Sequence, residues 1–437
     1  MNRKKGVRTC SQTMEFVPGL AATPGHDHDD PTEDVSPLPL EFFSSPQSIY
    51  DELRPRDSLD QPPVLLLRSS WLLARADQLR ACKTAEERCR LALPRRQDLL
   101  ATAPAAFYSV EEVEGLAKNT FKYRPWSTAI MRQMAVVSVS HAWSTAAHPD
   151  PEGHTVVALA DIIRKAQTKP VRTTDGTEQL LLPADLAVFF DWASLCQRDA
   201  DGSRSPTEQA AFEAALSRMQ LWYAHQMTTV VLMTAAQQLA SKAPAYSVRG
   251  WPTFEHACSM LGKPGVTRVF WPSLIDASVP GSTCVRRAPL TPEKMGALLT
   301  QKTFTNGADR AVVRRLYTAT ARAVIGGATT LNFSGLGLDN EQLQVLCEWL
   351  PQCSSLKELR LSGNRFTDEG VGALVEAVNK EGVLPNLQRL NLLPNSISET
   401  GMRTLRGALN EGALPSLTSW EATIGSKQKR AFMGVVR

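Results

Sequence analysis

Strand-like and helix-like patterns of apolar residues alternate between about residues 126 and 280. Three short apolar runs, at 134–140, 186–190 and 229–234, are typical of buried strands. Residues 154–166 and 206–225 instead carry apolar positions at helical spacing. Strands that alternate with helices predict parallel βαβ units. We therefore expect an α/β domain over 126–280, with an open parallel sheet covered by helices on both faces.

The N-terminal part of the chain shows a different pattern. Residues 1–60 are rich in Pro, Asp, Ser and Gly and hold few apolar clusters, so we expect a disordered leader. Helical periodicity begins at Val64 and is interrupted at Pro94. Ser109 and Glu112 have the spacing of a capping box, which predicts a short helix after Ser109. We interpret residues 61–125 as a helical collar.

Residues 264–325 lead from the end of the predicted sheet domain to the C-terminal part of the chain. The apolar stretch at 269–271 is a candidate last strand. Thr291 and Pro292 are typical of a helix N-cap and first helical position, so a helix should follow to about residue 300. A second helix is expected over 308–324. We interpret residues 281–325 as a helical bridge.

A repeated pattern begins near residue 326. The motif Leu-x-Leu-x-x-Asn occurs at 359–364 and 390–395, and a degenerate copy at 331–336 has Leu336 in place of the Asn. The spacings are 359 − 331 = 28 and 390 − 359 = 31 residues. Helices are predicted over 340–350, 368–378 and 399–409. A fourth, incomplete copy ends at Trp420 and should cap the array. Asn364 and Asn395 are expected to bond backbone groups where the chain leaves each strand.

This array resembles leucine-rich repeats of the long ribonuclease-inhibitor type, in which strands and full helices alternate. The resemblance implies a short α/β solenoid over 326–437 that binds a protein partner on its strand face. The outward strand positions do not identify that partner, because they are mixed in character: Arg360, Ser362, Asn391 and Leu393.

Composition and charge narrow the function classes. The chain is 43% hydrophobic and 21% charged, and 48 − 44 leaves a net charge of only +4. Such a balance disfavours nucleic acid or an anionic membrane as partner. Because there is no signal peptide and no apolar run of about 18 residues, we expect a cytoplasmic protein. The eight cysteines show no metal-ligand spacing, so we predict reduced thiols and no metal site.

Three chain segments leave the predicted carboxyl ends of the strands, at 140–144, 191–194 and 246–255. All three carry aromatic and polar side chains. Ligands of open α/β sheets bind at this edge, so these segments form the candidate site.

The alternating domain resembles a Toll/interleukin-receptor (TIR) domain. Its first strand ends in residues 138–140 (Ser-Val-Ser), and its second ends in an acid, Asp191. After the third strand, Tyr246, Trp251 and Glu255 keep the family's spacing of Tyr, Trp and Glu. The resemblance implies a domain with a flavodoxin-like parallel sheet. It also implies that this domain self-associates or cleaves NAD. Glu255 would be the catalytic residue, NAD the substrate, and no cofactor is required.

A substrate-binding role follows from the chemistry of the neighbouring side chains. Aromatic rings stack on flat ligands, and an arginine can contact a phosphate. The candidate substrate-binding residues are Tyr246, Arg249, Trp251, Trp143 and Asp191.

Structural roles for the same residues remain open. The alternative role for Trp251 is packing in a core or between domains. The alternative role for Glu255 is that of an acidic side chain favoured by the dipole at a helix N-terminus. His141 and His148 are interpreted as ordinary polar positions. Pro252 stands where the family often has Cys, and residues 168–185 form a long link. A non-enzymatic interaction scaffold is therefore the alternative function.

Overall fold

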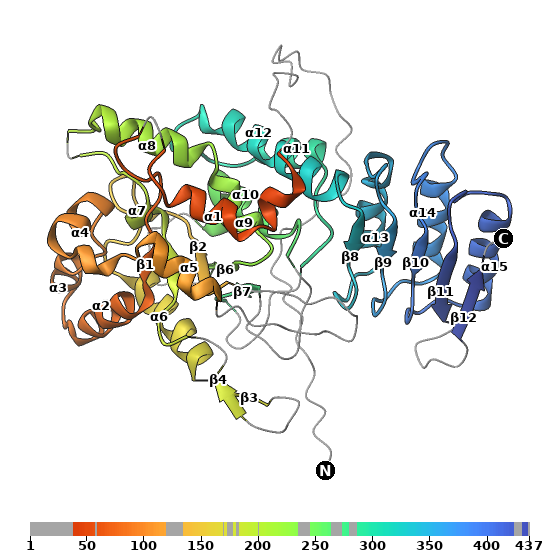
Figure 1. The fold of residues 1–437 in the computed structure, drawn as a ribbon, viewed down its shortest axis with the longest axis horizontal. Helices are drawn as coiled ribbons and strands as arrows, with labels where there is room; N and C mark the ends of the chain where they lie inside the picture. Colours follow the sequence, from red (N-terminus) through yellow and green to blue (C-terminus); the bar gives the residue numbers. More distant parts are fainter. Residues whose placement is uncertain are drawn as a thin grey trace.

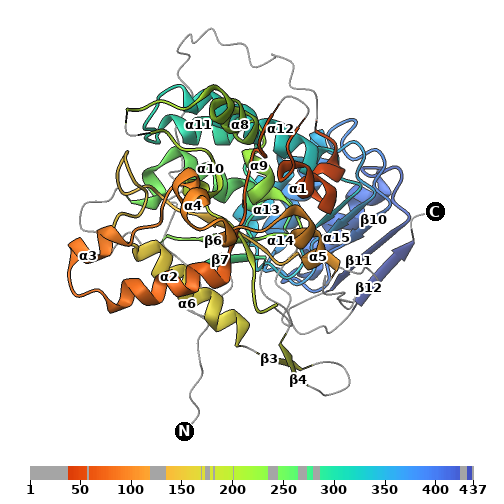
Figure 2. The same ribbon diagram turned by 60° about the vertical axis from the view of Figure 1, so that its left-hand side comes forward.

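The computed structural model describes residues 38–56, 59–118, 134–168, 170–172, 178–180, 183–199, 201–234, 245–263, 273–278, 286–423 and 431–435. Figures 1 and 2 show an α/β part that continues into a smaller strand–helix array at the C-terminal end of the chain.

The α/β part is built on a five-stranded sheet. Its strands lie in the order β1 (Leu67–Arg68), β5 (Ala187–Phe189), β2 (Val136–Ser140), β6 (Thr229–Leu232) and β7 (Leu274–Asp276). β5, β2, β6 and β7 are parallel, and β1 runs antiparallel at the edge beside β5. The predicted α/β class and parallel sheet are confirmed.

Consecutive strand residues pack on opposite faces of this sheet. Val136 joins the hydrophobic cluster that contains α9 (Met219–Ala224) and α10 (Gly250–Ser259). Val137 joins the cluster on the other face, which is covered by α2 (Ser69–Ala81) and α6 (His154–Gln167). Because both faces are buried, the strands carry continuous apolar runs instead of alternating ones.

Several elements of this domain differ from their sequence predictions. The single helix expected over 206–225 is two helices, α8 (Pro206–Leu216) and α9, because the chain turns at 217–218. The strand expected at 269–271 lies outside the described residues. The long link after α6 contains a two-stranded hairpin, β3 (Pro170–Arg172) and β4 (Glu178–Leu180).

The predicted disordered leader is wrong for its last third. Residues 40–52 form a 3-10 turn, η1 (Leu40–Phe43), and a helix, α1 (Pro46–Glu52). Phe43 and Ile49 are fully buried in the main core. A few apolar side chains thus dock a segment whose average composition is polar. Residues 1–37 lie outside the described residues.

The predicted collar is part of the sheet domain, since β1 pairs with β5 and α2 packs against α6. Residues 64–66 have no regular secondary structure, and the helix begins only at Ser69, after β1. The capping box at Ser109 is confirmed, with both of its hydrogen bonds to Glu112 present. The remaining elements of this region are α3 (Ala85–Arg90), α4 (Arg96–Thr102), η2 (Pro104–Ala106) and α5 (Val110–Lys118).

The bridge contains the two predicted helices, α11 (Pro292–Thr300) and α12 (Asp309–Ala321), followed by a π-helical turn, η5 (Arg322–Gly326). Thr291 caps α11 through its side chain, as predicted. α12 also packs against α9 and α10. The bridge is therefore a layer of the α/β domain as well as a connection.

The C-terminal array stacks four parallel strands: β8 (Thr330–Asn332), β9 (Glu358–Arg360), β10 (Arg389–Asn391) and β11 (Ser419–Thr423). An antiparallel strand, β12 (Ala431–Val435), pairs with β11 at the end. The helices between the parallel strands are α13 (Asn340–Cys347), α14 (Asp368–Val378) and α15 (Glu399–Asn410). Figure 1 shows these units side by side in repeating order.

The inward positions of the array strands align in one row. Leu331, Leu359, Leu390 and Trp420 occupy matching register positions, and all four are buried. Asn364 accepts hydrogen bonds from the backbone N–H groups of residues 336 and 338, and donates to the carbonyls of residues 333 and 361. Asn395 makes equivalent bonds one unit later. Both asparagines have the predicted structural role.

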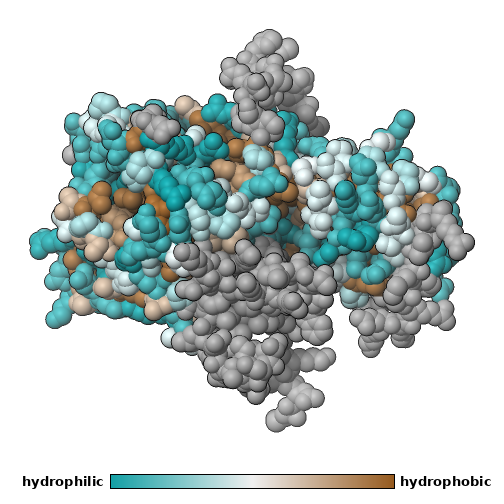
Figure 3. All heavy atoms as spheres, viewed as in Figure 1, coloured by the Kyte–Doolittle hydropathy of each residue, from teal (hydrophilic) through white to brown (hydrophobic). Residues whose placement is uncertain are grey.

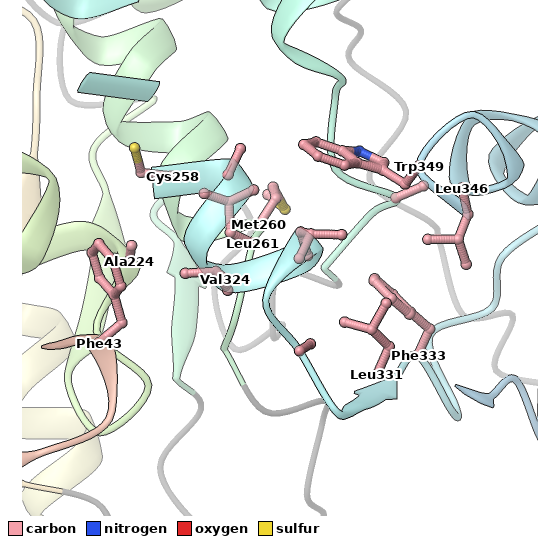
Figure 4. Packing of buried hydrophobic residues seen from close by; sticks show 14 of the residues in the cluster. Phe43, Ala224, Cys258, Met260, Leu261, Val324, Leu331, Phe333, Leu346 and Trp349 are labelled. Carbon is pink, nitrogen blue, oxygen red and sulfur yellow. The ribbon is translucent and has the colours of Figure 1, made fainter. Parts of the chain in front are cut away.

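One continuous hydrophobic core joins the array to the α/β domain. In Figure 4, Leu331 and Trp349 of the array lie on one side of this core, with Leu261 and Val324 opposite them. The Trp349 indole N–H donates to the Pro289 carbonyl (3.0 Å). The junction therefore resembles a domain core more than a linker.

Candidate functional site

Glu255 meets the end of the central strand β2. Ser140, the last residue of β2, donates a hydrogen bond of 2.6 Å to Oε2 of Glu255 on α10. The Tyr246 hydroxyl, from the 3-10 turn η4 (Tyr246–Val248), lies 2.5 Å from the Ser140 hydroxyl. Side chains from β2, η4 and α10 thus converge at the carboxyl end of β2. We call Ser140, Tyr246 and Glu255 the glutamate cluster.

The carboxyl group of Glu255 is deeply buried, with 6% of the residue exposed. Burial is the main reason that its pKa is raised to about 8, and the charge of Asp191 raises it further. The Ser140 hydrogen bond, His141 and Tyr223 act in the opposite direction without cancelling this effect. Glu255 is therefore mostly protonated at neutral pH in the unliganded protein.

A second group of polar side chains surrounds Asp191, which follows β5 and begins the short helix α7 (Asp191–Ser194). Its Oδ1 lies 2.8 Å from Nε2 of His141, and its Oδ2 accepts a 2.8 Å hydrogen bond from the Trp143 indole. The backbone N–H of Trp192 also donates to Oδ1 (2.6 Å). We call His141, Trp143 and Asp191 the aspartate cluster.

The two clusters lie close enough to interact, since the charges of Asp191 and His141 both act on Glu255. Burial alone would raise the pKa of Asp191, but His141 and its other hydrogen-bond donors lower it below its usual value. Glu255 and Asp191 are thus two carboxyl groups whose environments move their pKa values in opposite directions. Such a pairing is typical of acid and base roles at catalytic sites.

Four of the six predicted site residues, Tyr246, Glu255, Trp143 and Asp191, belong to these clusters. The predicted ligand contacts of Trp251 and Arg249 are not supported. The Trp251 indole donates to Asp309 of α12 (2.9 Å), and the Arg249 guanidinium donates to the Thr305 hydroxyl (2.8 Å). Both side chains pack the sheet domain against the 303–309 segment, as the alternative role for Trp251 anticipates.

Sequence reasoning undervalued His141 and missed Ser140 and Tyr223 as individual residues. Ser140 could have been found from its place at the carboxyl end of a central strand. His141 has no local signal, because its partner Asp191 is 50 residues away. His148 has the structural role expected of it, since its Nε2 bonds the Leu93 carbonyl (3.0 Å) and its ring packs on Trp192.

The strand face of the array carries charged and amide side chains. Glu358 forms ion pairs with Arg360 (2.9 Å) and Arg389 (3.2 Å), and Asn391 donates to Glu421 (3.0 Å). Figure 3 shows hydrophobic residues in small groups among hydrophilic ones on the visible face. Leu100 and Val248 are the exposed large hydrophobic residues among those whose side-chain exposure the structure describes, and neither belongs to the array. A partner of this strand face would therefore be recognised mainly through polar groups.

Two features are absent from the described part of the chain. No three or more His, Cys, Asp or Glu side chains gather there in a way that could hold a metal ion. No helix in those ranges has both the length and the apolar character needed to cross a membrane.

Comparison with known families identifies one segment of the array. A family model for a leucine-rich repeat matches residues 352–375, which contain β9, the turn with Asn364 and most of α14. The match supports a role in protein interaction for this part of the chain. Residues 352–375 thus contain a leucine-rich repeat.

Proposed function

We propose that this chain is a signalling-type protein in which a leucine-rich-repeat solenoid binds a protein partner and a TIR-like domain cleaves NAD. The observation that carries the enzymatic part is the contact between Glu255 and Ser140. This hydrogen bond joins α10, the helix that follows the third parallel strand (β6), to the end of the first parallel strand (β2).

The strand order supports a flavodoxin-like arrangement of the domain. Apart from the edge strand β1, the order is β5, β2, β6, β7, so the first parallel strand lies between the second and the third. In such sheets ligands bind where the strand order reverses, here between the ends of β2 and β6. Ser140 ends β2, and Glu255 lies on the helix that follows β6. The glutamate cluster therefore stands at the expected ligand position.

The chemistry of NAD cleavage fits a buried glutamate. Nicotinamide leaves the ribose through an oxocarbenium-like transition state, which a nearby carboxylate stabilises. A positive charge close to a carboxyl group lowers its pKa. The cationic nicotinamide ring would therefore ionise Glu255 on binding, and the low-dielectric surroundings would strengthen the resulting attraction. Because Glu255 is 6% exposed, substrate entry requires the residues around it to move.

The experiment that tests this function follows free nicotinamide after NAD is added to the purified full chain. The protein is assayed alone and after artificial clustering, because the TIR resemblance also implies self-association. Release by the wild type and its loss in Glu255→Ala support the proposal. No release from either form of the wild type, or equal release from the variant, contradicts it.

The second candidate function is a non-enzymatic interaction scaffold. The observation that favours it is the leucine-rich-repeat match, together with the exposed strand face of the array. Its test compares the proteins captured by the wild type and by Arg389→Glu, whose side chain is 62% exposed on that face. Arg403→Glu on the helical side is the control. A partner lost only with Arg389→Glu supports binding at the strand face, and a partner retained by both variants excludes it.

A further inference from the structure

We propose that His141 is a second catalytic residue of this site, the base that takes a proton from the attacking water, and that Asp191 positions it. This inference rests on the NAD-cleaving function proposed above, and adds a residue to that reaction.

The first support is the hydrogen-bonding state of the imidazole ring. An ionised carboxylate only accepts hydrogen bonds, so the 2.8 Å contact with Asp191 places a proton on Nε2 of His141. The neutral ring then carries its lone pair on Nδ1. Tilted packing against Phe190, with ring centres 4.5 Å apart, fixes the ring plane. Asp191 thus selects the tautomer in which Nδ1 is the basic atom.

The second support is that Nδ1 of His141 is buried and has no hydrogen-bond partner among the described residues. His141 is 3% exposed. Leaving a buried polar atom unsatisfied costs about 1–3 kcal/mol, so a group that donates a hydrogen bond to Nδ1 would bind there favourably. A substrate group or a reacting water would supply the missing partner.

The third support is the state of the neighbouring acids. Glu255 already accepts a hydrogen bond from Ser140, and in its ionised form it stabilises the positive charge on the ribose. Asp191 accepts three N–H groups and has a lowered pKa, so it is a poor proton acceptor. Among the side chains of the glutamate and aspartate clusters, we therefore assign the role of proton acceptor to Nδ1 of His141.

The reaction balances with these groups alone. A bond forms between the water oxygen and C1′ of the ribose, and the bond from C1′ to the nicotinamide nitrogen breaks. Its electron pair goes to that nitrogen and neutralises the ring's positive charge. The water proton passes to Nδ1 of His141 and is later released to solvent. Glu255 stabilises the positive charge on the ribose.

The charges around His141 predict how this step depends on pH. Burial lowers the pKa of His141. The negative charges of Asp191, Glu255 and Asp150 have a larger effect in the opposite direction, so the pKa is raised above its usual value. His148 is the other titratable group that interacts with the ring. Since a base must be deprotonated, kcat should rise with pH through the raised pKa of His141. Removing the charge of Asp191 should move that rise to lower pH.

The test measures kcat and KM for NAD against pH in the full-length wild type, His141→Gln and Asp191→Asn, with His154→Gln as the matched control. We expect His141→Gln to lower kcat by about 100-fold or more with KM little changed, and to abolish the rise of kcat with pH. Asp191→Asn should lower kcat less and shift the rise to lower pH. A His141→Gln variant that keeps its kcat, or that keeps the pH profile of the wild type, overturns the inference while NAD cleavage stands.

A second measurement does not depend on catalysis and is used if the wild type releases no nicotinamide. That result contradicts NAD cleavage, and ¹⁵N NMR of the imidazole then decides on His141. A neutral ring protonated on Nε2 supports the tautomer in which Nδ1 is the basic atom of the ring. A neutral ring protonated on Nδ1 overturns it.

Discussion

Ser140 at the end of β2 donates a 2.6 Å hydrogen bond to the carboxyl group of Glu255 on α10. This bond joins two segments that are 115 residues apart, at the edge of the sheet where ligands of such folds bind. It also favours the ionised form of a carboxyl group that burial otherwise keeps protonated. The ionisation of Glu255 is therefore the property that variants of this site should change.

The buried carboxyl group predicts how stability depends on pH. The pKa of Glu255 is raised to about 8, above that of an unfolded carboxyl, so the folded protein holds this proton more tightly. Its contribution to stability is present at low pH and is lost as the pH rises towards about 8. Relative to Glu255→Gln, the wild type should lose up to about 1.4 kcal/mol of unfolding free energy per pH unit. Urea unfolding at several pH values measures the unfolding free energy of both proteins. The same dependence on pH in the wild type and in Glu255→Gln would rule out the raised pKa of Glu255.

Removing the Ser140 hydroxyl should raise the pKa of Glu255 further, because the hydrogen bond favours the ionised carboxylate. The pKa can be followed by ¹³C NMR of the Glu255 carboxyl in Ser140→Ala. Ser138→Ala, also buried and two residues earlier in β2, is the control and should leave it unchanged. A pKa that falls in Ser140→Ala would contradict the bond.

The docking of residues 40–52 predicts a stability effect. Phe43 is fully buried in the main core, whereas Phe42 is only partly buried. Phe43→Ala should lower the unfolding free energy by about 3 kcal/mol or more, and Phe42→Ala by less. Thermal or urea unfolding tests this difference. Equal, small effects would mean that the segment does not contribute to the fold.

The asparagine of the array turn predicts another stability effect. Asn364→Ala leaves four backbone groups of two adjacent units without their side-chain partner. The loss should be about 2 kcal/mol or more. Asn410→Ala, at the exposed end of α15, is the control and should have little effect. Wild-type stability in Asn364→Ala would exclude the proposed turn role.

Local patterns were sufficient to predict much of the fold. The strands near 136, 187 and 229 are buried on both faces, so their apolar runs are visible in the sequence. The array repeats a motif, and its strands and helices lie within a few residues of their predicted bounds. β1 has only two residues and exists because it pairs with β5, more than 100 residues later. A pairing of that kind leaves no local pattern.

The candidate site was predicted less completely, for the same reason. Strand ends are predictable, so the sequence predicts that Tyr246, Glu255, Trp143 and Asp191 lie near the carboxyl ends of the strands. The directions of Trp251 and Arg249 depend on where α12 packs, and spacing within residues 246–255 cannot show this. The pairing of His141 with Asp191 likewise depends on the sheet order.

Nicotinamide release from NAD tests most directly whether this chain cleaves NAD through Glu255. The wild type, alone and clustered, is compared with Glu255→Gln, which keeps the side-chain shape but cannot ionise. Glu293→Gln, in the first turn of α11, is the matched control. We expect release by the wild type and by Glu293→Gln, with a loss of about 100-fold or more in Glu255→Gln. Release that is absent from the wild type, or undiminished in Glu255→Gln, would contradict it.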